Sequence, residues 1–495
     1  MRAFEGAAWI PTECLSTLPL TMVCNTARTT SMITRFDYLR GHQFFPIGAL
    51  LTCIFLASCA GPKEGPYSAS APGGVHHSAS VWSATRPATP GAAGNVTPVV
   101  IGIGPGGSIG KMNVPFVSVT LCRPGTSICQ TIDHILLDTG SYGLRIIAPD
   151  VLSPELALPD VTGPTGKPVA ECAQLFNGFL WGSVRRADVR IAAESALSVS
   201  IQQVSDAGAA FKNIPTECGH RGANAGTVAA LGANGILGIG LFKEDCGAEC
   251  AKRVIPGIYF ECTATKCTGT VMPLAKQVSN PVAAFDTNNN GVVIVMPAVA
   301  SGGVSTLVGS LIFGIDTQTN NTITTATVYA ANDDGNFTTT YNGKSLASSF
   351  LDTGANGLFF SDPSIQACSV SISFFCPPAP LMLSAVNASF NGVTSGQVNF
   401  TIDNLQLLGD SIRAASVGGT IGRNLKNKNF DWLITENELA RDVITVRASN
   451  VGGSPRRLSR STAFVWGMPF FFGRTVYIAI DGASTRHGPG PYWAY

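Results

Sequence analysis

Two aspartates open identical Asp-Thr-Gly triplets, Asp138 in the first half of the chain and Asp352, 214 residues later, in the second. Two carboxyl groups about 3 Å apart cannot both ionise, so the pKa of one rises and the pair shares a proton. The ionised group can take a proton from a bridging water while the protonated group donates to a carbonyl oxygen. Brought together by the fold, these side chains would have the chemistry to hydrolyse an amide bond without a metal or a covalent intermediate.

The residues around the two triplets follow one pattern. In residues 134–147 and again in residues 348–360, two apolar residues precede Asp-Thr-Gly, and a later Gly-Leu pair leads into a further apolar stretch. An internal repeat of domain size predicts two related halves. Within the triplets, Gly140 and Gly354 allow a close approach of the backbone, so that backbone amides can face the carboxylates.

The elements that must position the triplets are expected to be strands. From Val99 onward, short β-like runs alternate with turns rich in Gly, Asn, Asp and Pro, and only residues 192–200 and 437–442 are short helix candidates. We therefore expect an all-β fold with minor short helices. Charged residues are only 13% of the chain and the net charge is +1, which argues against nucleic acid as a partner.

The two repeated segments resemble the active-site loops of the pepsin-like aspartic proteases. Residues 235–240 and 465–474 resemble the apolar-apolar-Gly elements through which that family threads its catalytic loops. Residues 311–316 resemble the strand that opens its second lobe. More narrowly, the Asn-Asn-Asn-Gly turn at 288–291 and the ending at 488–495 resemble a family of uncharacterised bacterial lipoproteins.

This resemblance implies a bilobal fold with an interlobe cleft, formed by an N-terminal β lobe at 97–305 and a C-terminal β lobe at 306–495. It also implies an aspartic endopeptidase with Asp138 and Asp352 as the catalytic dyad. Such an enzyme needs no metal and no cofactor, acts on a peptide or protein, and is expected to be a monomer.

Several further residues take roles by the same resemblance. Thr139 and Thr353 are expected to cross-link the two loops through hydroxyl–backbone hydrogen bonds, and Gly238 and Gly467 to be the psi-loop glycines. Ser141 can donate a hydrogen bond to Asp138, whereas its counterpart Ala355 has no hydroxyl. The missing donor predicts a raised pKa of the dyad and a pH optimum less acidic than is usual in that family.

A β-hairpin flap closes over the substrate in that family, and residues 176–184 are the candidate here. They place aromatic residues around a glycine turn that includes Gly178. Trp181 stands about where the family has its flap tyrosine, but an indole offers an N–H donor and no hydroxyl. The alternative is an ordinary hairpin in which Trp181 packs into the wall of the cleft.

The N-terminal region predicts an export signal. A basic start at Met32 and the apolar run at 44–58 are typical of a secretory signal, and the run is shorter than the ~20 residues of a membrane span. The run ends in Leu-Ala-Ser-Cys, which resembles the lipobox of bacterial lipoproteins, so Cys59 is the expected lipidation site. An ordinary signal peptide followed by a chance cysteine is the alternative.

These features give a linear organisation. Residues 32–58 are expected to be a lipoprotein signal peptide. Residues 1–31 are interpreted as a spurious extension that begins at an upstream start codon and is not part of the functional chain. Residues 59–96, rich in Ala, Ser, Gly and Pro, would tether the body to the lipidated cysteine. The expected location is the bacterial cell envelope, at the outer rather than the inner membrane, with the globular part outside the cytoplasm.

Ten of the 14 cysteines fall within the body, and the pattern favours five disulfides formed in an oxidising compartment, with the pairing left open. Most cluster at short range, and Cys172 and Cys218 stand apart and could pair with each other. The clusters are Cys122 with Cys129, Cys246 and Cys250 with Cys262 and Cys267, and Cys368 with Cys376.

Metal binding is the alternative for two segments. Cys246 and Cys250 have a ligand-like spacing, which would compete with disulfide formation. Residues 286–291 begin like a calcium loop, but Pro297 occupies the twelfth position, where a glutamate is needed, so a hairpin turn is favoured.

Two other motifs are weaker. Residues 106–110 fit G-x-S-x-G, with His134 or His220 as the only candidate bases, but a strand rather than the required helix is expected next. Residues 102–107 fit G-x-G-x-x-G without a following helix. The main alternative to an endopeptidase is therefore a catalytically silent lipoprotein that binds peptides or glycans on the same fold.

Overall fold

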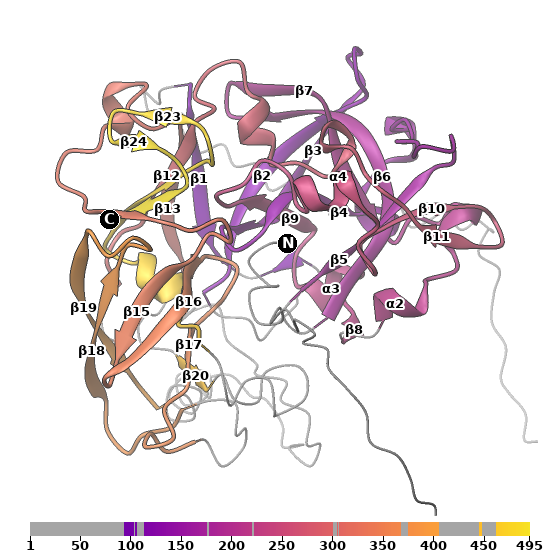
Figure 1. Ribbon diagram of the computed structural model, residues 1–495. Helices are drawn as coiled ribbons and strands as arrows, with labels where there is room; N and C mark the ends of the chain where they lie inside the picture. Colours follow the sequence, from indigo (N-terminus) through magenta and orange to yellow (C-terminus); the bar gives the residue numbers. More distant parts are fainter. Residues whose placement is uncertain are drawn as a thin grey trace, which may run out of the picture. The chain divides into compact units, whose positions relative to one another are not determined.

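Strands dominate the computed structural model, and no described helix is longer than five residues (Figure 1). The expected all-β class with minor helices is confirmed for the described part of the chain. None of the described helices is long and apolar enough to cross a membrane. The structure describes residues 94–102, 104–105, 113–175, 178–219, 222–299, 304, 306–367, 375–404, 445–447 and 462–495.

The helical elements are single turns between strands. The α-helices are α1 (Ala148–Val151), α2 (Thr216–Gly219), α3 (Val228–Leu231) and α4 (Ala248–Lys252). The 3-10 turns are η3 (Pro154–Leu156), η4 (Ala209–Phe211), η5 (Leu274–Lys276), η6 (Pro281–Ala284), η7 (Thr319–Asn321) and η9 (Met468–Phe471).

One sheet of 16 described strands runs through most of the structure. In order across the sheet these are β11 (Cys267–Gly269), β10 (Tyr259–Cys262), β5 (Val169–Gln174), β6 (Gly178–Ile191), β7 (Glu194–Val204), β4 (Tyr142–Ile147), β9 (Gly235–Ile239), β3 (Cys129–Asp138), β2 (Pro115–Cys122), β1 (Val96–Ile101), β13 (Leu307–Phe313), β12 (Gly291–Val295), β22 (Thr475–Ala479), β25 (Tyr492–Ala494) and β14 (Val328–Ala330), with β8 (Ala223–Asn224) beside β6.

A second sheet holds the other repeat. Its seven described strands are, in order, β19 (Ser395–Ile402), β18 (Leu381–Ala388), β15 (Phe337–Tyr341), β16 (Lys344–Asp352), β21 (Val465–Gly467), β17 (Leu358–Phe360) and β20 (Thr445–Arg447). A small pair, β23 (Ser484–Thr485) and β24 (Gly488–Pro489), lies near the end of the chain.

The two halves of the sequence share the large sheet. β1 pairs antiparallel with β13 over six residues, from Val96 opposite Ile312 to Ile101 opposite Leu307. On its other side β13 pairs with β12, which in turn pairs with β22. Strands from both expected lobes, 97–305 and 306–495, are therefore hydrogen-bonded into one sheet.

One expected helix is a strand. Residues 192–200 were interpreted as a helix candidate, but β7 begins at Glu194 and pairs with β6 along most of its length. Ala192 has a φ of 55° and forms the turn between these two strands. Cross-strand pairing thus overrides the helix preference of an alanine-rich segment. The second helix candidate, 437–442, lies outside the described residues.

The two Asp-Thr-Gly triplets begin at the last residues of two equivalent strands, β3 and β16. β9 lies between β3 and β4, parallel to β3 and antiparallel to β4, so Gly238 is opposite both Asp138 and Gly143. In the second sheet β21 lies in the same way between β16 and β17, with Gly467 opposite Asp352. The predicted sequence repeat therefore corresponds to a repeat of strand topology.

Both inserted strands need glycine where they pass the aspartates. A β-carbon on Gly467 would lie 1.9 Å from the carbonyl oxygen of Gly357, and one on Gly238 would lie 2.7 Å from the backbone nitrogen of Tyr142. Real β-carbons do not approach other atoms so closely. Glycine thus lets each inserted strand pass directly beside the loop that it supports.

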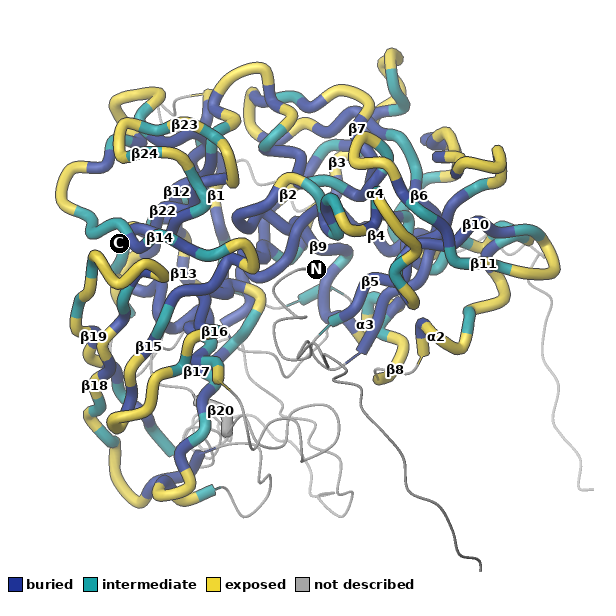
Figure 2. The backbone as a smooth tube through the Cα atoms, in the orientation of Figure 1, coloured by how far each residue is buried: buried dark blue, intermediate teal, exposed yellow. Residues whose placement is uncertain are grey.

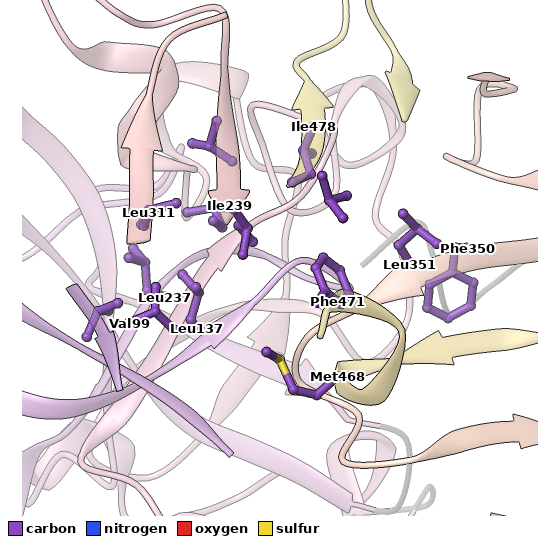
Figure 3. Packing of buried hydrophobic residues seen from close by; sticks show 14 of the residues in the cluster. Val99, Leu137, Leu237, Ile239, Leu311, Phe350, Leu351, Met468, Phe471 and Ile478 are labelled. Atoms are coloured by element: carbon purple, nitrogen blue, oxygen red, sulfur yellow. The ribbon is translucent and has the colours of Figure 1, made fainter. Parts of the chain in front are cut away.

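A single hydrophobic cluster contains the residues that precede both aspartates, Leu137 and Leu351. The strands β3 and β16 are partly exposed where they begin and buried where they reach the triplets, and the inserted strand β9 is buried throughout (Figure 2). Figure 3 shows Leu137 with Leu237, Val99 and Leu311, and shows Leu351 beside Phe350. Because both faces of β9 are covered, its sequence is a continuous apolar run rather than an alternating one.

Four disulfides are described, and all join cysteines within the groups identified from the sequence. They are Cys122–Cys129, Cys172–Cys218, Cys246–Cys250 and Cys262–Cys267. Cys376 is disulfide-bonded as well, whereas Cys368 lies outside the described residues. The metal alternative for Cys246 and Cys250 is wrong, because these thiols are bonded to each other.

The turn at 286–291 does not join two strands of a hairpin, because η6 precedes it and β12 follows. Its asparagines instead hold the loop after β13. Asn288 Oδ1 accepts from the Thr317 hydroxyl, and Asn290 Oδ1 accepts from the backbone N–H of Ile315. These side-chain oxygens thus stabilise a neighbouring loop.

Candidate active site

Asp138 is the last residue of β3 and Asp352 is the last residue of β16, and the fold brings their two loops into contact. A β-carbon on Gly140 would lie 2.8 Å from Asp352 Oδ1. Reciprocally, a β-carbon on Gly354 would lie 2.7 Å from Asp138 Oδ1. Each loop's glycine therefore makes room for the carboxylate of the other loop.

The two threonines join the loops by four reciprocal hydrogen bonds. Thr139 Oγ1 accepts from the backbone N–H of Thr353 at 3.0 Å and donates to the carbonyl of Leu351 at 3.0 Å. Thr353 Oγ1 accepts from the N–H of Thr139 at 3.1 Å and donates to the carbonyl of Leu137 at 2.7 Å. Both threonines are buried, so neither hydroxyl can exchange these partners for water.

Backbone amides within each loop point at its own carboxylate. Gly140 donates to Asp138 Oδ1 at 2.8 Å, and Gly354 donates to Asp352 Oδ1 at 2.8 Å. Each aspartate is 8% exposed, so both carboxyl groups sit in a largely water-excluded site.

The two carboxyl groups differ in their remaining donors. Ser141 donates its hydroxyl to Asp138 Oδ2 at 2.5 Å. At the equivalent position Ala355 offers only its backbone N–H, which donates to Asp352 Oδ1 at 3.2 Å. Burial and the adjacent carboxyl of Asp138 raise the pKa of Asp352 well above its usual range, against the backbone donors that lower it. A carboxyl group held protonated beside a second carboxyl is the condition for acid–base catalysis by a pair.

The side chain of Trp181 belongs to a cluster of buried hydrophobic residues. The hairpin of β5 and β6 is present, with Cys172 opposite Trp181. The Trp181 side chain is buried against Phe260, and its indole N–H donates to the carbonyl of Phe211 at 2.7 Å. Its single donor is thus already used, which favours the packing interpretation over a role in a flap.

Gly178, the other flap candidate, is held by a neighbouring strand. β6 begins at Gly178, which pairs in parallel with Ala223 of β8. A β-carbon at this position would lie 2.4 Å from the carbonyl oxygen of Ala223, which explains the glycine. The turn residues 176 and 177 lie outside the described residues.

The competing motifs gain no support. His134 Nδ1 lies 3.2 Å from Asp133, and its ring packs edge-on against Phe116. The G-x-S-x-G segment at 106–110 and His220 lie outside the described residues. No group of three or more potential metal ligands occurs among the side chains that the structure describes.

Two residues that support the site were missed by sequence reasoning. Asn113 is buried, has a φ of 58°, and donates its side-chain amide to the carbonyl of Asn356 in the second loop at 3.1 Å. No local pattern links residues 243 positions apart. Arg145 is buried on β4, and a charged residue within the apolar run after Asp138 was a signal that could have been used.

The family model described as "Protein of unknown function (DUF3443)" matches residues 91–435 and 436–495. No curated protein matches the chain. Among solved structures, the crystal structure of an aspartic proteinase from Irpex lacteus resembles it with a TM-score of 0.40 and 12% sequence identity, over 81% of this chain and 96% of that one. A likeness at this level supports no conclusion, so the function must be argued from this chain's own residues.

The threonine contacts predict a large loss of stability in Thr139→Val. Valine fills the same space but leaves the N–H of Thr353 and the carbonyl of Leu351 buried without these partners, at about 1–3 kcal/mol each. Urea unfolding should therefore show a loss of about 2–6 kcal/mol. Thr120→Val is the control, because its hydroxyl pairs with Thr131 in an exposed position. Equal effects of the two substitutions would contradict this account of the loops.

Proposed function

The chain belongs to the DUF3443 family of proteins of unknown function, and we propose that it is an aspartic endopeptidase with a pepsin-like bilobal fold. Asp138 and Asp352 would hydrolyse the peptide bond through a bridging water. The observation that carries the proposal is the meeting of the two carboxyl groups in one buried site, where four reciprocal threonine hydrogen bonds join their loops. Burial and the facing carboxyl of Asp138 also raise the pKa of Asp352.

The arrangement of donors supports a division of labour within the pair. Asp138 accepts hydrogen bonds from Ser141 and Gly140, which hold its carboxyl group in place for taking a proton from water. Asp352, whose pKa is raised by burial and by the facing carboxyl of Asp138, would pass a proton to the scissile carbonyl. Because the two carboxyl groups lie close together, a change at either one alters the pH dependence of the pair.

The repeated strand topology supports the bilobal fold. Each aspartate ends a strand that is paired with an inserted strand, and each inserted strand carries a glycine opposite the aspartate. In this proposal Gly238 and Gly467 are the psi-loop glycines. Thr139, Gly140, Ser141, Thr353, Gly354 and Ala355 form the active-site loops.

The cellular setting is proposed from the sequence. The resemblance of residues 56–59 to a lipobox supports a lipid anchor at Cys59, which lies outside the described residues, and the disulfides suit an oxidising compartment. The enzyme would then be a monomer in the bacterial envelope, anchored to the outer membrane, and would act there on a peptide or protein.

Replacing one aspartate tests the endopeptidase. Asp138→Asn should reduce cleavage of a mixed peptide library by about 10²- to 10⁴-fold, because a neutral amide cannot act as the base. Products should be quantified by mass spectrometry from mildly acidic to neutral pH, with Asp333→Asn as the control, since Asp333 is exposed.

Two results would sink the endopeptidase: no cleavage by the wild type, or equal cleavage by the wild type and Asp138→Asn. Binding of peptides or glycans without hydrolysis would instead support the silent binding protein.

The unequal donors predict the direction of a pH shift. Ala355→Ser supplies a hydroxyl that favours ionised Asp352, so the alkaline limb of the kcat profile, where the acid of the pair loses its proton, should move down by about one pH unit. Ser141→Ala removes a donor to the base Asp138 and should move the acidic limb upward. A wild-type optimum below about pH 3, or shifts of the opposite sign, would disprove this explanation of the asymmetry.

Lipidation at Cys59 predicts membrane attachment of the full chain. Cys59→Ser should move the protein from the membrane fraction to the soluble fraction of a bacterial host, because the thiol that carries the acyl chains is lost. Cys53→Ser is the matched control, since Cys53 lies within the same apolar run. A wild-type protein that is already soluble, or a Cys59→Ser variant that stays on the membrane, would exclude the anchor.

A further inference from the structure

Arg145 is an unusual residue for its position. It lies on β4, seven residues after Asp138, and exposes 1% of its surface. Its strand neighbours Leu144 and Ile146 are fully buried apolar residues. Arginine is almost never fully buried unless its charge is paired, because removing the guanidinium from water is expensive.

Two buried carboxyl groups pair with this arginine. Arg145 Nη2 lies 2.6 Å from Glu171 Oε1 and 3.0 Å from Asp245 Oδ2. Both acidic side chains are at most 1% exposed. Glu171 belongs to β5, whereas Asp245 follows β9, so the guanidinium joins three segments that are distant in sequence.

The other side of the guanidinium holds the catalytic loop. Arg145 Nη1 donates to the carbonyl of Tyr142 at 2.6 Å. Tyr142 directly follows Ser141, the hydroxyl donor to Asp138. Gly143 has a φ of 96°, and a β-carbon there would lie 2.5 Å from Val278 and 3.4 Å from Arg145 Nη1. The backbone thus turns closely around the guanidinium just after the loop.

The two carboxyl groups are themselves held in place. Tyr259 donates its hydroxyl to Asp245 Oδ1 at 2.6 Å and accepts from the N–H of Val278 at 2.9 Å. Gln202 donates to the carbonyl of Glu171 at 2.7 Å. In addition, each acidic residue directly precedes a disulfide-bonded cysteine, Cys172 in one case and Cys246 in the other.

The charges in this network balance only when one acid is neutral. The groups that act on Arg145 are Glu171, Asp245 and Tyr259. Burial, and secondarily the charge of Asp245, raise the pKa of Glu171 well above its usual range despite the attraction of Arg145. Neutral Glu171 can hydrogen-bond to Asp245, leaving one cation and one anion.

We propose that Arg145 is a positioning residue for the Asp138 loop, and that Glu171 and Asp245 fix its guanidinium against the backbone at Tyr142. The effect of Arg145 on catalysis rests on the proposed endopeptidase function, whereas its effect on the position of the Asp138 loop does not. The pKa of Glu171 is raised in the folded state. The stability that this network contributes is therefore fully present below the ordinary pKa of glutamate and is lost as the pH rises through the raised value.

Arg145→Lys tests the positioning. Lysine keeps the charge but lacks the fork that reaches both the carboxylates and the loop. Amide hydrogen exchange in peptides covering residues 138–147 should become about tenfold faster as local opening becomes easier. In the endopeptidase assay kcat should fall by about tenfold or more, with KM changed by less than about threefold, because the reacting groups are misplaced rather than lost.

Arg185→Lys is the matched control. Arg185 also pairs with two carboxylates, Asp160 at 2.7 Å and Asp206 at 2.6 Å, but it lies on β6 and makes no described contact with the loop. Its substitution should leave exchange at 138–147 unchanged. If Arg145→Lys changes that exchange no more than Arg185→Lys does, the inference is wrong, even where peptide hydrolysis is real. If the wild type hydrolyses nothing, the exchange result still decides.

Glu171→Gln provides a second test if Arg145→Lys fails to fold. Glutamine has the shape of neutral glutamic acid but cannot ionise, so the network should persist at all pH values. In the wild type, exchange at 138–147, corrected for intrinsic chemistry, should accelerate as the pH rises, and in Glu171→Gln this acceleration should vanish. The same pH dependence in both proteins would overturn the proposed role of the network.

Discussion

The reciprocal hydrogen bonds between Thr139 and Thr353 are the constraint on which the site depends. Each hydroxyl accepts from the other threonine's backbone and donates to the carbonyl just before the other aspartate. The spacing of the two carboxyl groups is therefore set by two short, buried threonine side chains that are hydrogen-bonded to the backbone of the opposite loop. Because these bonds are buried, breaking one leaves polar groups without water, which makes the spacing resistant to thermal fluctuation.

The residues around this symmetric centre support the two carboxyl groups unequally. On the Asp138 side a hydroxyl from Ser141 reaches the carboxylate, and Arg145 holds the backbone beyond it. On the Asp352 side the equivalent positions are Ala355 and Phe359, which offer neither a hydroxyl nor a charge. The duplicated scaffold thus fixes where the carboxyl groups lie, whereas the departures from symmetry give them different hydrogen-bond donors.

The sequence predicted the parts of this structure that depend on local pattern. Paired triplets in equal apolar frames indicated two equivalent strand ends, and short-range cysteine spacing indicated which groups would form disulfides. The strand at 194–204 was missed because its partner β6 overrides alanine's helix preference. The Arg145 network was missed because Asp245 is 100 residues away, and no local pattern encodes a contact made through folding.

The topology of the two inserted strands also determines the order in which the two halves of the site can form during synthesis. The strand that carries Asp138, its neighbours β2 and β9, and β4 beyond β9 all lie between residues 115 and 239, so that half of the pair can be built from an early part of the chain. Asp352 instead depends on β21, which begins only at Val465. During synthesis from the N-terminus, the nascent chain therefore cannot support its second carboxyl group until β21 has been made, long after Asp352 itself.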